Sequence, residues 1–132
     1  MILSGNTCSS TCLSGYGMTF NVTYCVFCDL RCTACFDLSN NCTSCKSSGT
    51  YASYFLPSNF SCLATCPTGT FLNIGDRTCY PCDTSCVSCG IAATRCYECK
   101  STFAWMNYFC YNPCPYRTFL NNGNCTPCSP LC

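Results

Sequence analysis

Cysteine is the residue type whose number and spacing in this chain could do chemistry. The sequence has 21 cysteines among 132 residues and no histidine. Seven CxxC motifs begin at Cys25, Cys32, Cys42, Cys79, Cys86, Cys96 and Cys125. Cysteines at this spacing occur in zinc sites, in redox-active thiol sites and in disulfide frameworks. These three chemistries place different demands on the rest of the chain.

Zinc and redox chemistry fit the motifs less well than disulfides do. Residues 79–90, CYPCDTSCVSCG, have the spacing of a four-cysteine zinc site, and the whole chain would suit about five such ions with one thiolate left over. A thioredoxin-type CxxC is a single reactive motif at the start of a helix, whereas here the motif recurs along the chain. The repetition favours a disulfide framework, with no catalytic or metal site and no cofactor, and leaves zinc and redox chemistry as the weaker alternatives.

Four N-x-S/T tripeptides strengthen the case for disulfides. They begin at Asn21, Asn41, Asn59 and Asn124. Together with a cysteine content far above roughly 8–10%, they predict a secretory, oxidising route and an extracellular or cell-surface location. Covalent N-glycans are the expected modification. We expect Asn21 and Asn59 to be modified more readily than Asn41 and Asn124, which directly precede a cysteine.

The remaining composition argues against several classes of function. A net charge of +1 provides no electrostatic surface for nucleic acid, and no apolar run of about 18 residues predicts a membrane span. The chain has no GxSxG, P-loop or HExxH motif, and its few acids are spread along it, so we do not expect an enzyme. The expected role of the acids is turn formation or solubility; they are Asp29, Asp37, Asp76, Asp83 and Glu98.

The cysteines recur in a fixed order that divides the chain into repeats. Repeat 1 covers residues 8–45 and repeat 2 covers residues 62–99, with identical cysteine spacing in both. A truncated repeat 3 covers residues 110–132, and CPTGTFLN at 66–73 returns there as CPYRTFLN at 114–121. Variable loops at 46–61 and 100–109 separate the repeats. Residues 1–7 are a lead-in or the end of a preceding repeat.

This pattern resembles the growth-factor-receptor cysteine-rich, or furin-like, repeat, over nearly the whole chain. Large cysteine-rich surface proteins of ciliates and other protists are similar. The resemblance implies small two-disulfide modules in which the first cysteine bonds the third and the second bonds the fourth. The implied bonds are Cys8–Cys25, Cys12–Cys28, Cys32–Cys42, Cys35–Cys45, Cys62–Cys79, Cys66–Cys82, Cys86–Cys96, Cys89–Cys99, Cys110–Cys125 and Cys114–Cys128.

Cys132 is then left unpaired in this chain. Its place in the register is that of the first cysteine of a further module, so we expect the chain to be part of a longer array. The absence of a signal peptide before Cys8 agrees with that expectation. An interchain disulfide through Cys132, or a free thiol, is the alternative.

The expected fold class is small and disulfide-rich: an elongated rod of tandem modules with short β-hairpins and little or no helix. The best hairpins are TFLN at 70–73 with a turn at 74–76, and TFLN at 118–121 with a turn at 122–124, where Asn122-Gly123 is a strong turn signal. Residues 53–60 and 103–109 form the variable loops and are weaker hairpin candidates.

The favoured function is structural. The chain would be a segment of an extracellular, N-glycosylated coat, fibre or spacer, with further repeats of the same protein or a homo-oligomer as its partners. The alternative is a ligand-binding receptor ectodomain or a variable surface antigen. Aromatic side chains in the variable loops either fill the small cores or pack against glycans or a neighbouring copy. The candidates for this interface are Tyr51, Tyr54, Phe55, Trp105, Tyr108 and Phe109.

Overall fold

A computed structural model describes residues 2–4, 7–9, 11–21 and 24–130, the first two segments by their backbone only. The described residues form short strands and turns, with no helix among them. This confirms the small, disulfide-rich, strand-rich fold class. The strands are β1 Ile2–Ser4, β2 Thr7–Ser9, β3 Tyr16–Met18, β4 Cys25–Phe27, β5 Cys32–Cys35, β6 Cys42–Cys45, β7 Tyr54–Leu56, β8 Ser61–Leu63, β9 Thr70–Asn73, β10 Thr78–Pro81, β11 Cys86–Cys89, β12 Cys96–Cys99, β13 Ala104–Met106, β14 Phe109–Tyr111, β15 Thr118–Asn121 and β16 Asn124–Pro127.

The chain divides into two compact units. The first consists of Met1–Cys66 and Ile74–Cys79, and the second of Pro67–Asn73 and Tyr80–Cys132. The division therefore falls inside repeat 2 and not in a variable loop.

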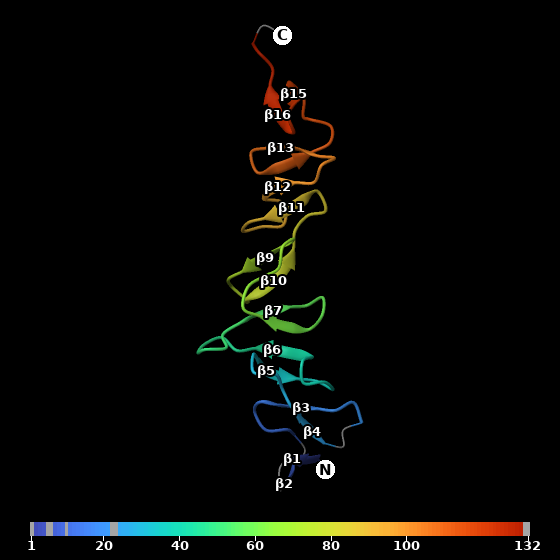
Figure 1. Cartoon of the computed structure of the whole chain (residues 1–132), viewed down its shortest axis with the longest axis vertical. Helices are drawn as coiled ribbons and strands as arrows, with labels where there is room; N and C mark the ends of the chain where they lie inside the picture. Colours follow the sequence, from blue (N-terminus) through green and yellow to red (C-terminus); the bar gives the residue numbers. More distant parts are fainter. Residues whose placement is uncertain (1, 5–6, 10, 22–23, 131–132) are drawn as a thin grey trace. The chain divides into compact units, whose positions relative to one another are not determined.

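The first unit is a succession of antiparallel hairpins, which Figure 1 shows from blue to green. Strands β1 and β2 pair, as do β3 and β4, β5 and β6, and β7 and β8. The first residue of β10, Thr78, pairs with Phe55 of β7 in the parallel direction. This bridge brings the end of the unit back onto its last hairpin.

The second unit repeats this arrangement. Hairpin β11–β12 is followed by hairpins β13–β14 and β15–β16, and a parallel pairing of Trp105 with Asn124 joins the last two into a sheet of order β14-β13-β16-β15. The Trp105 N–H donates to the carbonyl of Gly123 at 2.9 Å. The equivalent bond in the first unit runs from Phe55 N–H to the Arg77 carbonyl at 3.0 Å.

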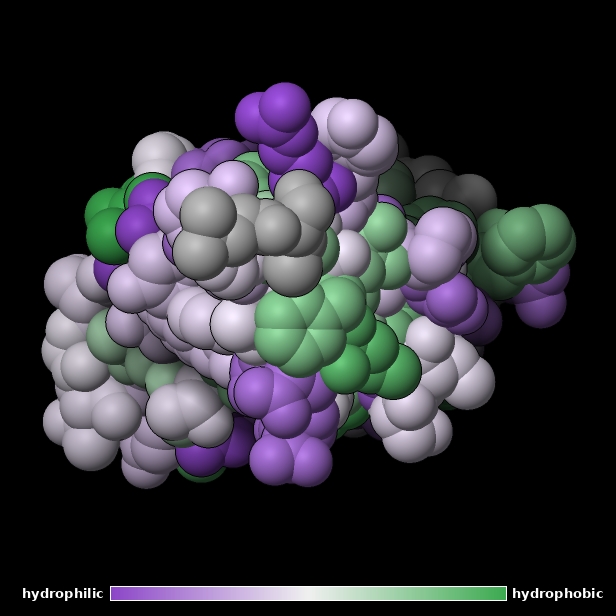
Figure 2. All heavy atoms as spheres, turned by 90° about the horizontal axis from the view of Figure 1, so that it is seen from above, coloured by the Kyte–Doolittle hydropathy of each residue, from purple (hydrophilic) through white to green (hydrophobic). Residues whose placement is uncertain are grey.

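Sulfur forms most of the interior. Among the residues whose side chains the structure describes, ten of the twelve buried apolar ones are cysteines, and the other two are Leu56 and Ala104. Large apolar side chains are correspondingly exposed, among them Phe20 and Tyr116. Figure 2, a view onto the C-terminal end, shows apolar residues dispersed among hydrophilic ones. A chain with so little buried hydrocarbon depends on covalent cross-links for its stability.

The expected hairpin at 118–124 is confirmed. Strands β15 and β16 pair with Asn121 opposite Asn124, and the two turn residues have φ of 47° at Asn122 and 79° at Gly123. Positive φ at both central residues is the requirement of a type I′ turn, which Asn-Gly meets at low cost. TFLN at 70–73 likewise forms strand β9, with a turn after it.

Both variable loops also contain hairpins. Strands β7 and β8 pair within residues 54–63, and β13 and β14 pair within residues 104–111. The β13–β14 turn has φ of 52° at Asn107 and 68° at Tyr108, the same backbone shape as Asn122-Gly123 without its glycine. The Tyr108 ring packs edge-on against Trp105 and beneath Arg95, contacts that favour this turn in the absence of glycine.

Candidate functional site: the disulfide framework

Nine disulfides join the described residues, and they are the dominant chemistry of the chain. Five lie in the first unit and four in the second. They are Cys12–Cys25, Cys28–Cys35, Cys32–Cys42, Cys45–Cys62, Cys66–Cys79, Cys82–Cys89, Cys86–Cys96, Cys99–Cys110 and Cys114–Cys125.

The implied pairing is wrong at most positions. The structure contains Cys32–Cys42 and Cys86–Cys96 as implied, but every other described bond has a different partner. The bonds that the structure replaces are Cys8–Cys25, Cys12–Cys28, Cys35–Cys45, Cys62–Cys79, Cys66–Cys82, Cys89–Cys99, Cys110–Cys125 and Cys114–Cys128.

The interlocked first-to-third, second-to-fourth pattern is present, but in a frame shifted by one cysteine. It consists of Cys28–Cys35 with Cys32–Cys42. The Cys28 N–H donates to the Gly15 carbonyl at the end of hairpin β3–β4, and its side chain is bonded to Cys35, the last residue of β5. Cys28 thus bonds forward into the next hairpin and not backward to Cys12.

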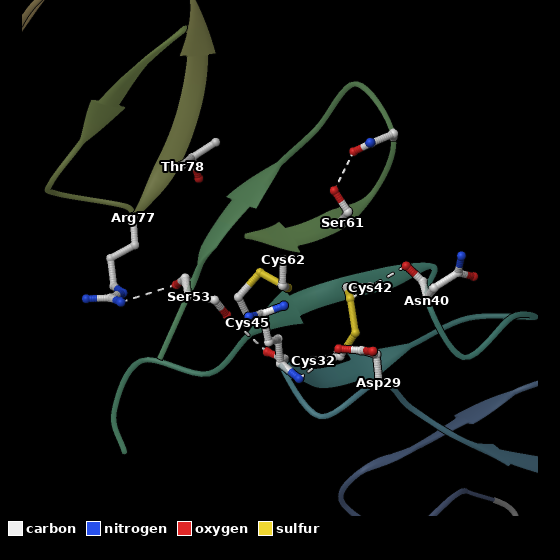
Figure 3. The surroundings of a disulfide bond; sticks show 12 residues. Asp29, Cys32, Asn40, Cys42, Cys45, Ser53, Ser61, Cys62, Arg77 and Thr78 are labelled. Carbon is white, nitrogen blue, oxygen red and sulfur yellow. Dashed lines mark hydrogen bonds between the residues drawn. A yellow bond between two sulfur atoms is a disulfide. The ribbon is translucent and has the colours of Figure 1, made fainter. Parts of the chain in front are cut away.

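The shift leaves the last cysteine of each repeat free to bond the next repeat. Cys45 ends β6 and bonds Cys62 of β8, with Cα atoms 5.6 Å apart. The Cys42 N–H also donates to the Phe60 carbonyl at 2.7 Å, which places hairpin β5–β6 on hairpin β7–β8. Figure 3 shows this disulfide beside Cys32–Cys42. Repeat 2 is joined onward in the same way by Cys99–Cys110.

A buried serine strengthens the joint in the first unit. The Ser53 side chain is fully buried, and its Oγ donates to the Arg31 carbonyl at 3.2 Å. The Arg77 guanidinium donates to the Ser53 carbonyl at 3.2 Å (Figure 3). It also lies over the Tyr54 ring at 4.9 Å. Sequence reasoning missed this contact, since serine in a loop has no pattern that signals burial.

Cys128 has no disulfide partner among the described residues and is half-buried. Its expected partner, Cys114, bonds Cys125 instead. The residues equivalent to Cys128 in the earlier repeats are Cys28 and Cys82, and each bonds the cysteine seven positions later. The Cys8 side chain and all of Cys132 lie outside the described residues.

Three of the five acids accept a hydrogen bond within a turn, as expected: the side chain of Asp29 accepts from Arg31 N–H, that of Asp76 from Thr78 N–H, and that of Asp83 from Ser85 N–H. The Asp37 side chain instead accepts from the N–H of Phe20, which is distant in sequence. The Ser85 hydroxyl donates a second bond to Asp83 at 2.6 Å. Hydrogen bonds from this hydroxyl and from the backbone of Ser85 lower the pKa of Asp83 below its ordinary value, because they stabilise the charged carboxylate.

The sequon asparagines differ in exposure. Asn21, Asn59 and Asn124 are exposed, whereas Asn41 is half-buried. At Asn59 the hydroxyl of Ser61, the third residue of the sequon, donates to the asparagine Oδ1 at 2.6 Å. Three of the four sequon asparagines are therefore exposed in the folded chain.

The candidate interface aromatics are not sequestered in their modules. Tyr51, Tyr108 and Phe109 are exposed, while Tyr54, Phe55 and Trp105 are half-buried. Phe55 packs against the buried cysteine cluster of the first unit, which includes Cys42 and Cys62. The Trp105 indole N–H donates to the Cys96 carbonyl at 3.2 Å. The half-buried rings thus pack within their modules. The exposed rings also have neighbours within the chain, since Tyr108 packs against Trp105 and Phe109 against Tyr111, but each keeps part of its surface in solvent.

Comparisons with known proteins are sparse for this chain. No protein-family model and no solved structure matches it. Over 102 residues, or 76% of this chain, it is 30% identical to Furin-like protease 2 of Drosophila melanogaster. The match covers 6% of that protein, so the chain spans only a small part of the relative's length. This similarity, with the disulfide-rich fold, supports a furin-like cysteine-rich repeat and carries no catalytic activity to this chain.

The described residues include no helix with the length and apolar character needed to span a membrane.

Proposed function

We propose that this chain is a structural segment of an extracellular, N-glycosylated cysteine-rich repeat protein that serves as a surface coat, fibre or spacer. The carrying observation is the disulfide between consecutive repeats, Cys45–Cys62 and again Cys99–Cys110. Such a bond gives each pair of consecutive repeats a second covalent connection beside the backbone, which suits a load-bearing or protective role.

The surface agrees with this role. The exposed sequons at Asn21, Asn59 and Asn124 offer places for glycans, and exposed Tyr51 and Phe109 offer apolar contact with sugars or a neighbouring copy. The disulfides support an extracellular location, because a reducing cytosol would not maintain them. The placement of the acids in separate turns supports a non-catalytic role.

Measurement of the shape of the molecule in solution tests the proposal. A compact chain of this length has a radius of gyration of roughly 14 Å. Small-angle scattering of the secreted, oxidised chain should give a distinctly larger value, and electron microscopy should show rods or filaments. A compact particle without filaments would contradict the proposal. Enzymatic deglycosylation followed by intact-mass measurement, with Asn→Gln variants as controls, tests each sequon.

A second candidate, a ligand-binding ectodomain, is favoured by one feature of the second unit. An open pocket of about 500 Å³ lies between residues 101–104, 111–114 and 118–123, with Phe103, Tyr111 and Leu120 among its lining. Saturable capture of one extracellular partner, abolished by Phe103→Ala and retained by Ser129→Ala, would support this candidate over a scaffold.

A further inference from the structure

In both complete repeats a third sulfur lies against a buried disulfide. The Sγ atoms of Cys32, Cys42 and Cys62 all lie within 4.8 Å of one another. Two of them form one disulfide, and the third belongs to the bond that joins the repeats (Figure 3). The same arrangement recurs at Cys86, Cys96 and Cys110. It is therefore a property of the repeat and not an accident of one hairpin.

The sulfurs differ in their access to solvent. Cys32 and Cys42 are 1% and 2% exposed, and Cys62 is 6% exposed, whereas Cys45 is half-buried. A thiol from solution therefore reaches the joint at Cys45 and cannot reach the Cys32–Cys42 bond directly. Only Cys62, from inside the core, is placed to attack that bond. Access and the identity of the attacked sulfur are what direct thiol–disulfide exchange.

We propose that Cys45 is a site of S-thiolation by low-molecular-weight thiols. Cys62, released from Cys45, then bonds one cysteine of the neighbouring Cys32–Cys42 disulfide, so that the cross-link between the repeats is kept. The incoming thiolate bonds the Cys45 sulfur, and the Cys45–Cys62 bond breaks with its electron pair leaving on Cys62. The Cys62 thiolate bonds Cys42 or Cys32, and the broken bond leaves a thiolate on the other of these two. Two disulfides and one thiol are present before and after, so no further oxidant or reductant is needed.

The exchange preserves the cross-link between the repeats and leaves the free thiol on Cys32 or Cys42. Strand β8 stays tied to hairpin β5–β6, now through Cys62 and one of the two inner cysteines. Cys45 carries the incoming thiol as a mixed disulfide. The cross-link between the repeats is thus transferred and not opened when a small thiol attacks it. At the second cross-link Cys110 is half-buried, as Cys99 is, so a thiol from solution is not directed to one of its two sulfurs.

The first test uses the unmodified chain. The oxidised protein is treated with limiting reduced glutathione, quenched with acid, unfolded in denaturant so that buried thiols become accessible, and alkylated. It is then digested with trypsin and chymotrypsin, which cleave after Arg31, Phe36 and Lys46, and the bonds are assigned by tandem mass spectrometry. We expect glutathione on Cys45, a bond from Cys62 to Cys42 or Cys32, and the alkyl group on the remaining inner cysteine. Alkylation confined to Cys62, or no glutathione on Cys45, would overturn the proposal.

The second test compares two variants that each free one cysteine. Cys45→Ser frees Cys62, and the matched Cys66→Ser frees Cys79, which is fully buried but belongs to no such group of three sulfurs among the described residues. We expect Cys45→Ser to distribute its free thiol onto Cys32 or Cys42, while Cys66→Ser retains it on Cys79. Equal retention at Cys62 and Cys79 would contradict the transfer. If Cys45→Ser does not fold, the glutathione experiment decides alone.

Discussion

Gly17 shows how little room the sulfur core leaves around the backbone. It occupies the strand position at which repeat 2 has Phe71 and repeat 3 has Phe119, and it lies directly against Cys35 of β5. A Cβ atom on Gly17 would collide with the carbonyl group and the Sγ of Cys35. The requirement for glycine at this position comes from close approach and not from its φ angle.

We therefore predict that Gly17→Ala destabilises the first unit by about 1–3 kcal/mol, the typical cost of overpacking. The colliding atoms are backbone and a disulfide sulfur, which cannot rotate away. Denaturant unfolding of the oxidised protein measures the change. The exposed Ser44→Ala variant is the control and should unfold like the original chain. A Gly17→Ala protein as stable as this control would show that β3 and β5 are not in close contact.

Asp83 offers a residue-level prediction that depends on pH. Replacement of Ser85 by alanine removes the hydroxyl, which is the largest cause of the lowered pKa of Asp83, so that pKa should rise toward its ordinary value. A carboxyl group whose folded-state pKa is lowered contributes stability above its unfolded pKa, and that stability is lost as the pH falls through the folded pKa. The variant should accordingly lose less stability on acidification than the original.

Titration of the Asp83 carboxyl carbon by NMR measures this effect. Thr84→Ala is the control, because Thr84 acts on Asp83 through its backbone N–H, which alanine retains. An unchanged pKa in Ser85→Ala would mean that the backbone bonds alone account for the shift.

Among the elements, the hairpin turns show what local sequence can specify. Asn122-Gly123 predicts a type I′ turn from two residues, because the turn needs positive φ at both positions and these residue types provide it. We predict that Gly123→Ala weakens hairpin β15–β16 by about 1–2 kcal/mol, the cost of an L side chain in the left-handed region.

Amide hydrogen exchange is the measurement for this turn. Exchange in β15 and β16 should accelerate while exchange in β11 and β12 stays constant. Asn122→Gly, which also tolerates positive φ, is the matched control and should leave both hairpins unchanged. Uniform acceleration in all hairpins would instead indicate that the second unit opens as a whole.

The disulfide pairing was the part of the site that sequence could not supply. The turn residues predicted hairpins, because a hairpin depends on neighbours along the chain. Pairing depends on which hairpin lies beside which. The bond from Cys45 to Cys62 follows from β6 lying beside β8, held by the Cys42 N–H on the Phe60 carbonyl. No spacing rule reports that contact, and a shift of one cysteine in frame looks identical in the sequence.

For the whole molecule, the shifted pairing places a disulfide across every site at which trypsin can cut the backbone. The chain has six basic residues, and each lies between two cysteines that are bonded to one another across it. For example, Lys46 lies within the loop closed by Cys45 and Cys62, and Arg77 within the loop closed by Cys66 and Cys79. A single cut in any such loop leaves the two sides joined. A coat built in this way would survive clipping by a trypsin-like protease.

Complete digestion with trypsin under non-reducing conditions tests this continuity. Cleavage after Arg31, Lys46, Arg77, Arg95, Lys100 and Arg117 makes seven peptides, and the nine disulfides connect all of them in series. We expect one species, heavier than the intact chain by one water for each cut, which separates into peptides only after reduction. The pairing implied by the resemblance would instead release residues 1–31, 32–46, 47–100 and 101–132 as four separate species. Release of 1–31 without reductant would contradict the Cys28–Cys35 bond, and release of 32–46 would also contradict the Cys45–Cys62 bond. Either result would remove the cross-linked array on which the proposed structural role depends.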